Sequence, residues 1–228
     1  MRITWQEVRL GGDVAEASQS RVAAGARADD GTERKDRYHH GDLRESLIEA
    51  TRALVHAKGA EHFTLADACR FAGVTTAAPY KHFRDKQEIL EIVCQRGFEK
   101  LKADTAHAVE VAGPGTLEAI QLMGRAYTTF ASTEPNLFRL MFGQNSDLKT
   151  AGIVDEAGTG CLAYLIEQVA LFIEKQGRAE DPRHVALKLW TFVHGASCLL
   201  IDHDYDKVAP GLDVEALVNS ASRDILGS

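Results

Sequence analysis

The sequence predicts an all-α protein, and two observations support this. Apolar residues recur at the 3.6-residue period of an amphipathic helix, most regularly from Leu162 to Ile173. Residues that begin or end helices separate these segments: Gly177 can end one helix, and Asp181 with Pro182 can begin the next. The 228 residues are 45% hydrophobic, which is enough for a sizeable buried core.

The segment FTLADACRFAGVTTAAPYKHF, residues 63–83, predicts two short helices joined by a tight turn. Thr64 can cap the first helix, Gly73 permits the bend, and Pro79 requires that the second helix has just begun at a cap on Thr75 or Thr76. Small apolar residues can lock the pair at a steep angle: Leu65, Ala68, Cys69, Ala72 and Val74. Other side chains remain outward on the second helix: Thr76, Ala77, Tyr80 and Lys81. This arrangement is typical of a helix-turn-helix.

The run GVTTAAPYKHFRDKQEIL is similar to the recognition helix and following helix of the TetR family of bacterial transcription regulators. The upstream run RYHHGDLRESLIEATRALVHAKGAEHFTLADACRFAG resembles the first two helices of that family. The resemblance implies a three-helix DNA-binding domain at residues 37–84, a connecting helix to about residue 103, and a larger effector-binding and dimerisation domain at residues 104–228. An unrelated helical hairpin with a chance Tyr-Lys-His-Phe is the alternative.

The net charge of -7 conceals an uneven distribution. Residues 34–102 contain 13 Lys and Arg against 10 Asp and Glu, whereas residues 104–228 contain 9 against 17 and residues 1–33 contain 4 against 6. The helix-turn-helix region therefore has the charge that suits an approach to phosphate, and the remainder does not.

Candidate DNA contacts follow from the chemistry of the outward face and from the resemblance. A hydroxyl, a methyl and an ammonium group can all contact base edges, which predicts this role for Thr76, Ala77 and Lys81. The resemblance places a second group near phosphates, beside the cap Thr75: Thr64, Tyr80, His82 and Lys86. The alternatives are a surface His82 packed on Phe83 and a solvated Lys86.

Apolar periodicity and helix-breaking residues predict the other helices. We expect helices at about residues 42–58, from Asp85 past residue 101, and at about 117–130, 135–142, 162–177, 182–203 and 214–225. The boundaries between Gly143 and Gly158 are not predicted. In the helix that follows Asp181, one stripe carries Val185, Leu189, Phe192, Val193, Ala196, Leu199 and Leu200, with Trp190 and Ile201 off it. A helix that is apolar on more than one side must bury more than one face, and the resemblance implies that the last two long helices pair with a second subunit.

Large, soft side chains in the second half could line a ligand cavity: Met123, Tyr127, Phe138, Met141, Phe142, Phe172, Trp190 and His194. For each of them, core packing is the alternative. The run Leu189–Gly195 resembles a regulatory-domain subgroup marked by Trp, His and Gly, in which Gly195 would allow a close helix approach. His194 either contacts an effector or is a hydrogen-bonded core histidine.

Other functional classes find little support. Cys69, Cys94, Cys161 and Cys198 are scattered, which indicates reduced packing residues, with redox sensing as a minor alternative. His194, Cys198, Asp202 and His203 fall on one stretch, but a single straight helix spaces them too far apart for one metal ion. We find no catalytic motif, and we expect no cofactor.

No apolar run approaches a membrane span and the amino end lacks a secretion signal, so we expect a cytoplasmic protein. Residues 1–36 are expected to be disordered. We expect a passive tail, followed directly before the first helix by a basic arm of Arg34, Lys35 and Arg37 that could touch DNA.

The resemblance implies a homodimeric regulator that binds a palindromic operator and is released by a small, apolar or aromatic effector. Most members of the family repress, so repression is the default and activation the alternative within the family. A dimeric small-molecule-binding protein or enzyme with a vestigial DNA-binding head is the alternative from another class. The effector, the operator sequence and the regulated genes are not predicted.

Overall fold

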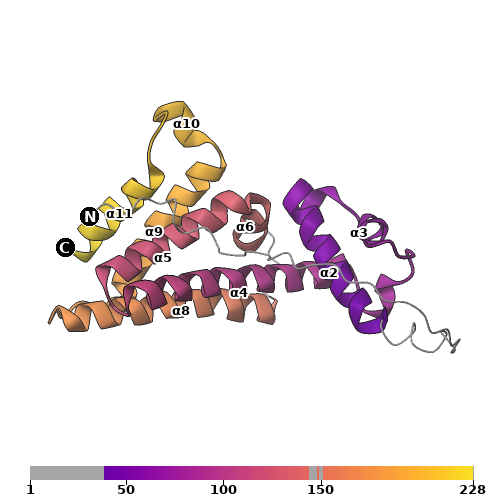
Figure 1. The fold of residues 1–228 in the computed structure, drawn as a ribbon, viewed down its shortest axis with the longest axis horizontal. Helices are drawn as coiled ribbons and strands as arrows, with labels where there is room; N and C mark the ends of the chain where they lie inside the picture. Colours follow the sequence, from indigo (N-terminus) through magenta and orange to yellow (C-terminus); the bar gives the residue numbers. More distant parts are fainter. Residues whose placement is uncertain (1–38, 144–147, 149–150, 228) are drawn as a thin grey trace, which may run out of the picture. The chain divides into compact units, whose positions relative to one another are not determined.

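The computed structural model describes residues 39–143, 148 and 151–227, and from His39 onward the chain forms one compact unit (Figure 1). The expected extension at residues 1–36 lies outside the described residues. Only helices occur in the described part, as predicted. They are α2 (His39–Lys58), η1 (Ala60–His62), α3 (Leu65–Ala72), η2 (Pro79–Lys81), α4 (Lys86–Ala112), α5 (Leu117–Thr133), α6 (Pro135–Phe142), α8 (Gly152–Lys175), α9 (Pro182–Ile201), α10 (Asp204–Val208) and α11 (Val214–Leu226).

Helices α2 and α3 form the frame of the helix-turn-helix. Helix α2 begins at His39, three residues before the predicted Asp42, and Gly59 ends it with a φ of 81°. The predicted cap of α3 is confirmed: Thr64 Oγ1 accepts from the Asp67 backbone amide, while the Asp67 carboxylate accepts from the Thr64 amide. Gly73 ends α3 in the left-handed region, with a φ of 70°.

The predicted second helix is shorter and tighter than expected. Residues 75–78 form a turn and only Pro79–Lys81 form a helix, of the 3₁₀ type, whose cap is Ala78 rather than Thr75 or Thr76. The expectation of a cap at Thr75 or Thr76 was therefore wrong. Pro79 has no amide hydrogen for the Thr75 carbonyl, which instead accepts from the Ala78 amide at 3.0 Å.

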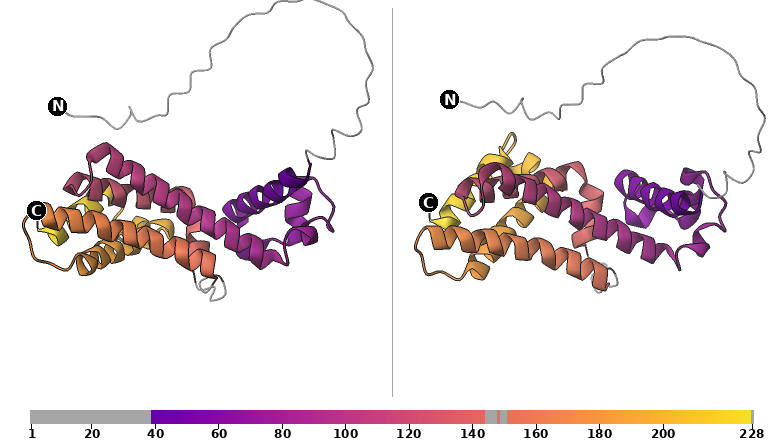
Figure 2. Two further views of the ribbon diagram at one scale, coloured as in Figure 1. Left: turned by 90° about the horizontal axis from the view of Figure 1, so that it is seen from below. Right: turned by 60° about the horizontal axis from the view of Figure 1, so that its bottom comes forward.

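Helix α4 connects the helix-turn-helix to the rest of the chain (Figure 2). Asp85 caps it as predicted, accepting from the Glu88 amide. Helix α4 packs on α2 and α6, and then on α5 and α8. One contiguous core cluster consequently extends from Leu47 in α2 through α4 and α6 to Ile201 in α9.

The carboxy-terminal half packs α5, α8, α9 and α11 against one another. Helix α8 begins at Gly152, ten residues before its first regularly spaced apolar residue, and α10 was not predicted. In α9, Ile201 is buried and Leu199 is 43% exposed, so the predicted stripe was wrong at its end. The buried face instead follows Val185, Leu189, Val193 and Ile201.

Helices α8 and α9 are long and apolar enough to cross a membrane by length and composition alone. The expectation that no segment approaches this length was therefore wrong. This is weak evidence for a membrane span, because core helices of soluble proteins pass the same test. Here α8 packs on α4 and α9, and α9 packs on α5 and α11.

Candidate nucleic-acid interface and effector cavity

The second short helix and the turn before it present the predicted base-contacting side chains to the outside. Thr75, Thr76, Ala77, Tyr80 and Lys81 are all exposed, and the Tyr80 side chain is 67% exposed. Beneath them, Pro79 is buried and Phe83 is 3% exposed in the core. Because Pro79 and Phe83 are buried on the inner side of the turn, the polar side chains of the turn face solvent.

Two predicted phosphate contacts, Thr64 and His82, also contact other residues of the helix-turn-helix region. Thr64 is exposed, but its hydroxyl is already used by the cap and donates to Asp67 Oδ2 at 2.7 Å. The His82 ring is half-buried, with its centroid 6.4 Å from that of Phe83. The position of His82 thus matches the surface packing on Phe83 that was the alternative to a phosphate contact.

Lys86 is neither solvated nor extended from the surface. Its Nζ donates to the carbonyls of Ala60 and Phe63, each at 2.6 Å, and lies 4.1 Å from the centroid of the Phe63 ring. Burial lowers the pKa of this ammonium below its usual value. Lys86 ties the start of α4 to the loop before α3, a role that its position in a charged turn did not reveal.

An exposed aromatic side chain on α3 was missed. Phe71 is 64% exposed, close in sequence to the turn that presents Thr75 and Thr76. The sequence indicated this exposure only indirectly, because Phe71 is a large apolar residue outside the buried stripe of a short helix.

A cavity of about 540 Å³ lies among the helices of the carboxy-terminal half. It is large enough for a small organic ligand. Its lining comes from six helices: Phe98, Leu101 and Thr105 in α4; Ile120, Met123, Gly124 and Tyr127 in α5; Met141 and Phe142 in α6; Val154, Asp155, Gly158, Thr159, Cys161, Leu162 and Leu165 in α8; Leu189, Trp190, Phe192, Val193 and His194 in α9; Val218, Ser222 and Ile225 in α11.

Six of the eight predicted ligand residues lie in this lining: Met123, Tyr127, Met141, Phe142, Trp190 and His194. Phe138 does not, because it is 2% exposed behind the cavity wall, where its ring stacks on His194 with centroids 5.4 Å apart. Phe172 packs in a separate core cluster with Ile120 and Val185. The contributions of α8 and α11 were missed, since apolar periodicity does not show which neighbour a helix faces.

Tyr127 and His194 form a hydrogen-bonded polar pair in the wall, apart from the other polar lining residues Thr105, Asp155, Thr159 and Ser222. The Tyr127 hydroxyl lies 2.9 Å from His194 Nδ1, and His194 Nε2 lies 3.7 Å from the Cys198 sulfur. Burial raises the pKa of the Tyr127 hydroxyl far above its usual value, partly opposed by a hydrogen bond with Trp190. Tyr127 is therefore a neutral hydrogen-bonding group at physiological pH.

Cys161 also reaches the cavity, between α4 and α8. Its sulfur lies 3.4 Å from the Phe98 carbonyl oxygen, and burial raises the pKa of the thiol to about 11. At neutral pH Cys161 is a protonated, weakly reactive thiol, which favours a packing role over redox sensing.

Two stretches of the chain match families of known proteins. Residues 47–93 match the family described as bacterial regulatory proteins, tetR family. Residues 120–225 match the family described as tetracyclin repressor-like, C-terminal domain. The chain carries both domains of the TetR family. No curated protein matches it in sequence.

Solved structures share the fold of these TetR-family domains over most of their length. A protein with unknown function from Rhodococcus sp. RHA1 is 29% identical, with a TM-score of 0.72 over 83% of this chain and 96% of that chain. The fatty acid degradation regulator FadR from Bacillus halodurans is 17% identical, with a TM-score of 0.64 over 81% and 98%. The ketosteroid transcriptional regulator KstR2 of Mycobacterium tuberculosis is 17% identical, with a TM-score of 0.55 over 81% and 93%.

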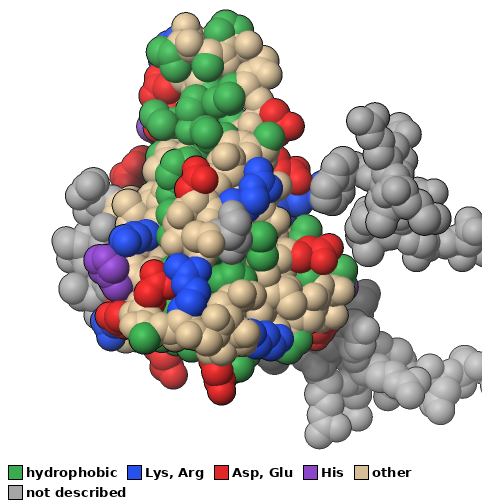
Figure 3. Space-filling view, turned by 90° about the vertical axis from the view of Figure 1, so that its left-hand side faces the viewer, with side chains coloured by type: hydrophobic (Ala, Val, Ile, Leu, Met, Phe, Trp, Pro, Cys, Tyr) green, Lys and Arg blue, Asp and Glu red, His purple; other side chains and the backbone are tan. Residues whose placement is uncertain are grey.

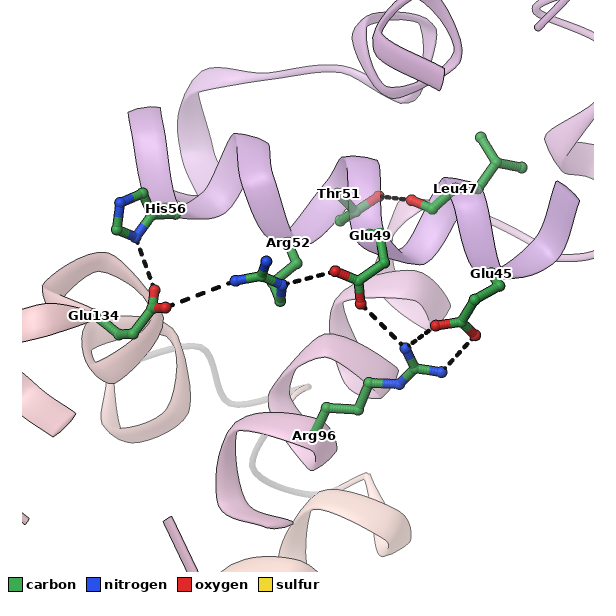
Figure 4. Close-up of polar contacts among 8 residues, drawn as sticks. All are labelled: Glu45, Leu47, Glu49, Thr51, Arg52, His56, Arg96 and Glu134. Atoms are coloured by element: carbon green, nitrogen blue, oxygen red, sulfur yellow. Dashed lines mark hydrogen bonds and ion pairs between the residues drawn. The ribbon is translucent and has the colours of Figure 1, made fainter. Parts of the chain in front are cut away.

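Polar contacts tie the first helix of the TetR-family DNA-binding domain to the helices behind it (Figure 4). The Arg96 guanidinium in α4 donates to both carboxylate oxygens of Glu45, with Nη2 to Oε2 at 2.7 Å, and to Glu49 at 3.3 Å. This bond to Arg96 holds the pKa of Glu45 below its usual value. Both acidic residues lie on α2, so Arg96 fixes α2 against α4.

A second set of contacts joins α2 to the start of α6 (Figure 4). Glu134 Oε2 lies 2.8 Å from His56 Nδ1, and Glu134 Oε1 lies 3.6 Å from Arg52 Nη1. The Asn136 side chain donates to the His56 carbonyl at 2.9 Å. The short helix that carries Met141 and Phe142 to the cavity is thus anchored on α2 at its other end.

The four residues considered for a metal site do not converge on one point. Asp202 pairs with Arg139 at 2.7 Å, and His203 lies 3.0 Å from Asp206. His194 and Cys198 contact each other, as described above. Within residues 39–143, 148 and 151–227, no group of three or more His, Cys, Asp or Glu side chains is placed to hold a metal ion.

Proposed function

We propose that this TetR-family regulator is a cytoplasmic repressor that binds a palindromic operator as a homodimer and leaves it when a small apolar molecule fills the cavity. The exposed polar surface over Thr75–Lys81, held from below by Pro79 and Phe83, carries the DNA-binding part of this proposal. Phosphate contacts would position this surface, and Thr76, Ala77 and Lys81 would read base edges.

The outer side of α9 supports dimerisation through α9 and α11. A Cβ atom added at Gly195 would meet no atom of the described chain within 4 Å. The expectation that Gly195 allows close packing thus does not hold within one chain, but its open space would accommodate a helix of a second subunit. One turn further along α9, Leu199 is 43% exposed. A partner helix over these two positions would bury the apolar surface that one chain leaves open.

Two more exposed apolar residues follow α9 in the chain. Val208 at the end of α10 is 79% exposed and Leu212 before α11 is 38% exposed. Figure 3 shows hydrophobic side chains gathered at the top of the view, where Figure 1 places α10. Dimerisation through α9 and α11 would place two DNA-binding surfaces on one duplex, as a palindrome requires.

Release of the operator by an effector would depend on a change in the position of α6. This helix carries Met141 and Phe142 into the cavity lining, while Glu134 and Asn136 at its other end contact α2. A ligand that favours a different position of α6 would disfavour the DNA-bound arrangement of α2, and this difference between two states is all that allostery requires. Trp190, His194 and Gly195 also support placing this domain in the Trp-His-Gly subgroup.

Selection of bound duplexes from a random DNA pool by the purified full-length chain tests the proposal. We expect enrichment of a palindrome with half-sites about one helical turn, roughly 10 base pairs, apart. Recovery of no enriched palindrome would contradict DNA binding and favour a vestigial head. Repeating the selection with candidate ligands would then identify those that reduce recovery of the palindrome.

A further inference from the structure

The charge of the cavity lining restricts the chemistry of the effector. We propose that the cavity takes an uncharged molecule, an apolar skeleton carrying a hydroxyl or carbonyl oxygen, and discriminates against the corresponding carboxylate. This inference rests on the proposed function and narrows it to one class of effector.

The described lining contains no lysine or arginine, and apart from the titratable ring of His194 its one ionisable side chain of ordinary charge is the carboxylate of Asp155. Asp155 is exposed, so it lies where the cavity meets the surface. Lys102 is the basic residue of this region of α4, with its Nζ 3.9 Å from the position of a Cβ at Gly160, but it is exposed and outside the lining. A buried anion would therefore meet no lysine or arginine among the described lining residues, only the titratable ring of His194, and an anion at the rim would meet the carboxylate of Asp155.

Burying an unpaired carboxylate costs free energy, and this cost favours the neutral ligand over the anionic one. A carboxylate that leaves water must be paired or fully hydrogen-bonded to recover its hydration energy. The walls beside Tyr127 are mostly aromatic and aliphatic: Phe98 and Phe142 meet edge to face with centroids 5.2 Å apart, and Trp190 lies beside His194 at 5.7 Å. These walls offer contact area for an apolar skeleton but no compensation for a negative charge.

The Tyr127 hydroxyl can still bind a neutral oxygen. A hydroxyl has one donor hydrogen and two acceptor positions, and His194 Nδ1, 2.9 Å from the Tyr127 oxygen, occupies one of these three. If His194 donates to the Tyr127 oxygen, the hydroxyl hydrogen remains for a ligand carbonyl or hydroxyl. If the Tyr127 hydrogen goes to His194, an acceptor position remains for a ligand hydroxyl. Either tautomer of His194 therefore leaves Tyr127 able to anchor one oxygen.

The positions of the lining helices give room for the skeleton on both sides of this anchor. The lining includes residues of α6, next to the DNA-binding domain, and of α11, further from it (Figures 1 and 2). Tyr127 lies on α5, which packs on both of these helices. The contacts thus suit an extended apolar molecule or a fused-ring one, anchored by an oxygen at Tyr127.

Two matched probe pairs test the discrimination: 1-dodecanol with dodecanoate, and 2-naphthalenemethanol with 2-naphthoate. The chain has two tryptophans, so the full-length Trp5→Phe variant leaves Trp190 in the lining as the only indole reporter. Titration at pH 8, where both acids are ionised, measures each affinity from the Trp190 fluorescence. We expect each alcohol to bind at least about tenfold more tightly than its carboxylate.

Removal of one oxygen atom tests the anchor. Tyr127→Phe keeps the ring and should weaken binding of the alcohols by roughly three- to tenfold, the value of one hydrogen bond. Tyr164→Phe is the matched control, because Tyr164 lies on α8 outside the lining and packs against a different cluster. This control should bind both alcohols as the parent does.

Equal or tighter binding of the carboxylates overturns the inference, as does a failure of either alcohol to bind, or an equal loss in the Tyr127→Phe and Tyr164→Phe variants. These outcomes are separate from the DNA result, since fluorescence titration needs no operator. A chain that selects a palindrome but binds dodecanoate best would keep the proposed function and lose this inference. A chain that binds the alcohols but selects no DNA would lose the proposed function.

Discussion

The carboxylate of Glu134, at the junction of α5 and α6, pairs with the ring of His56, near the end of α2, with Oε2 and Nδ1 2.8 Å apart. This pair joins the helix that braces the helix-turn-helix to the helix that reaches the cavity. Farther along α6, Arg139 donates to the Ile201 carbonyl at 2.9 Å and to Asp202 at 2.7 Å, at the end of α9. Helix α6 therefore contacts α2, the cavity and α9 within eight residues.

Glu134→Ala should uncouple the cavity from the DNA-binding surface. Loss of the contacts to His56 and Arg52 should reduce the effector-induced fall in operator affinity by about two- to fivefold, while affinity for the effector alone is retained. Fluorescence anisotropy on the selected operator, with and without the alcohol that binds, measures this ratio. Glu118→Ala, an exposed acid in the first turn of α5, is the control. An unchanged ratio in Glu134→Ala would show that coupling does not pass through this contact.

Lys81→Ala and Tyr80→Ala should each weaken operator binding by about tenfold or more, because they remove a base-edge contact and a phosphate contact from an exposed surface. Lys100→Ala removes the same charge from an exposed position on α4, about 21 Å along the helix axis from its start, and should bind as the parent does. Gel-shift titration on the selected operator measures all three. If Lys81→Ala and Tyr80→Ala both bind the operator as tightly as the parent, Lys81 and Tyr80 are not DNA contacts.

The helix-turn-helix could be predicted from the sequence where local chemistry decides the conformation. Thr64, Gly73 and Asp85 act as expected, because a cap or a left-handed glycine depends on a few neighbouring residues. The 3₁₀ turn at Pro79 was missed, although Pro79 was expected to restrict where the helix begins, because a single hydrogen bond decides between an α-helical and a 3₁₀ turn. The carbonyl contacts of Lys86 were not predicted, because its partners lie 23 and 26 residues earlier in the chain.

The cavity could be predicted only in part, for a related reason. Large soft residues on α5, α6 and α9 indicated its composition, and Tyr127, Trp190 and His194 do meet there. Phe172 packs in a different core cluster from the cavity lining. Helix α8 is long enough to contribute to several clusters, and the spacing of its apolar residues does not distinguish between them. Which cluster a residue joins depends on how α8 crosses its neighbours, and the sequence does not show this.

Gly195→Arg should convert a dimer to monomers. The monomer has room for the new side chain, and replacement of a mid-helix glycine favours the helix, so the fold should be retained. A second subunit over this position would meet a bulky charge. Light scattering with size-exclusion chromatography measures the mass. Gly152→Arg, also without a neighbour within 4 Å, should stay dimeric. A dimeric Gly195→Arg protein would place the interface elsewhere.

Gly115→Ala should lower the free energy of unfolding by about 2 to 5 kcal/mol. The φ of Gly115 is +60°, and a Cβ there would lie 2.5 Å from the Leu171 Cβ and 2.9 Å from the Leu171 carbonyl carbon. Gly177→Ala has a similar φ, +62°, but no neighbour within 4 Å, so it should cost about 1 kcal/mol. Urea denaturation measures both. Equal losses would show that the contact with α8 is not tight.

The spacing of the two operator half-sites tests most directly the central claim that paired DNA-binding domains read one duplex together. The measurement is the affinity of the full-length chain for its selected operator before and after insertion of five base pairs between the half-sites, half a helical turn. If the paired domains bind together, the five-base-pair insertion should lower the affinity at least about a hundredfold, with partial recovery on insertion of ten base pairs. Unchanged affinity after the five-base-pair insertion would contradict it, because the two domains would then bind independently.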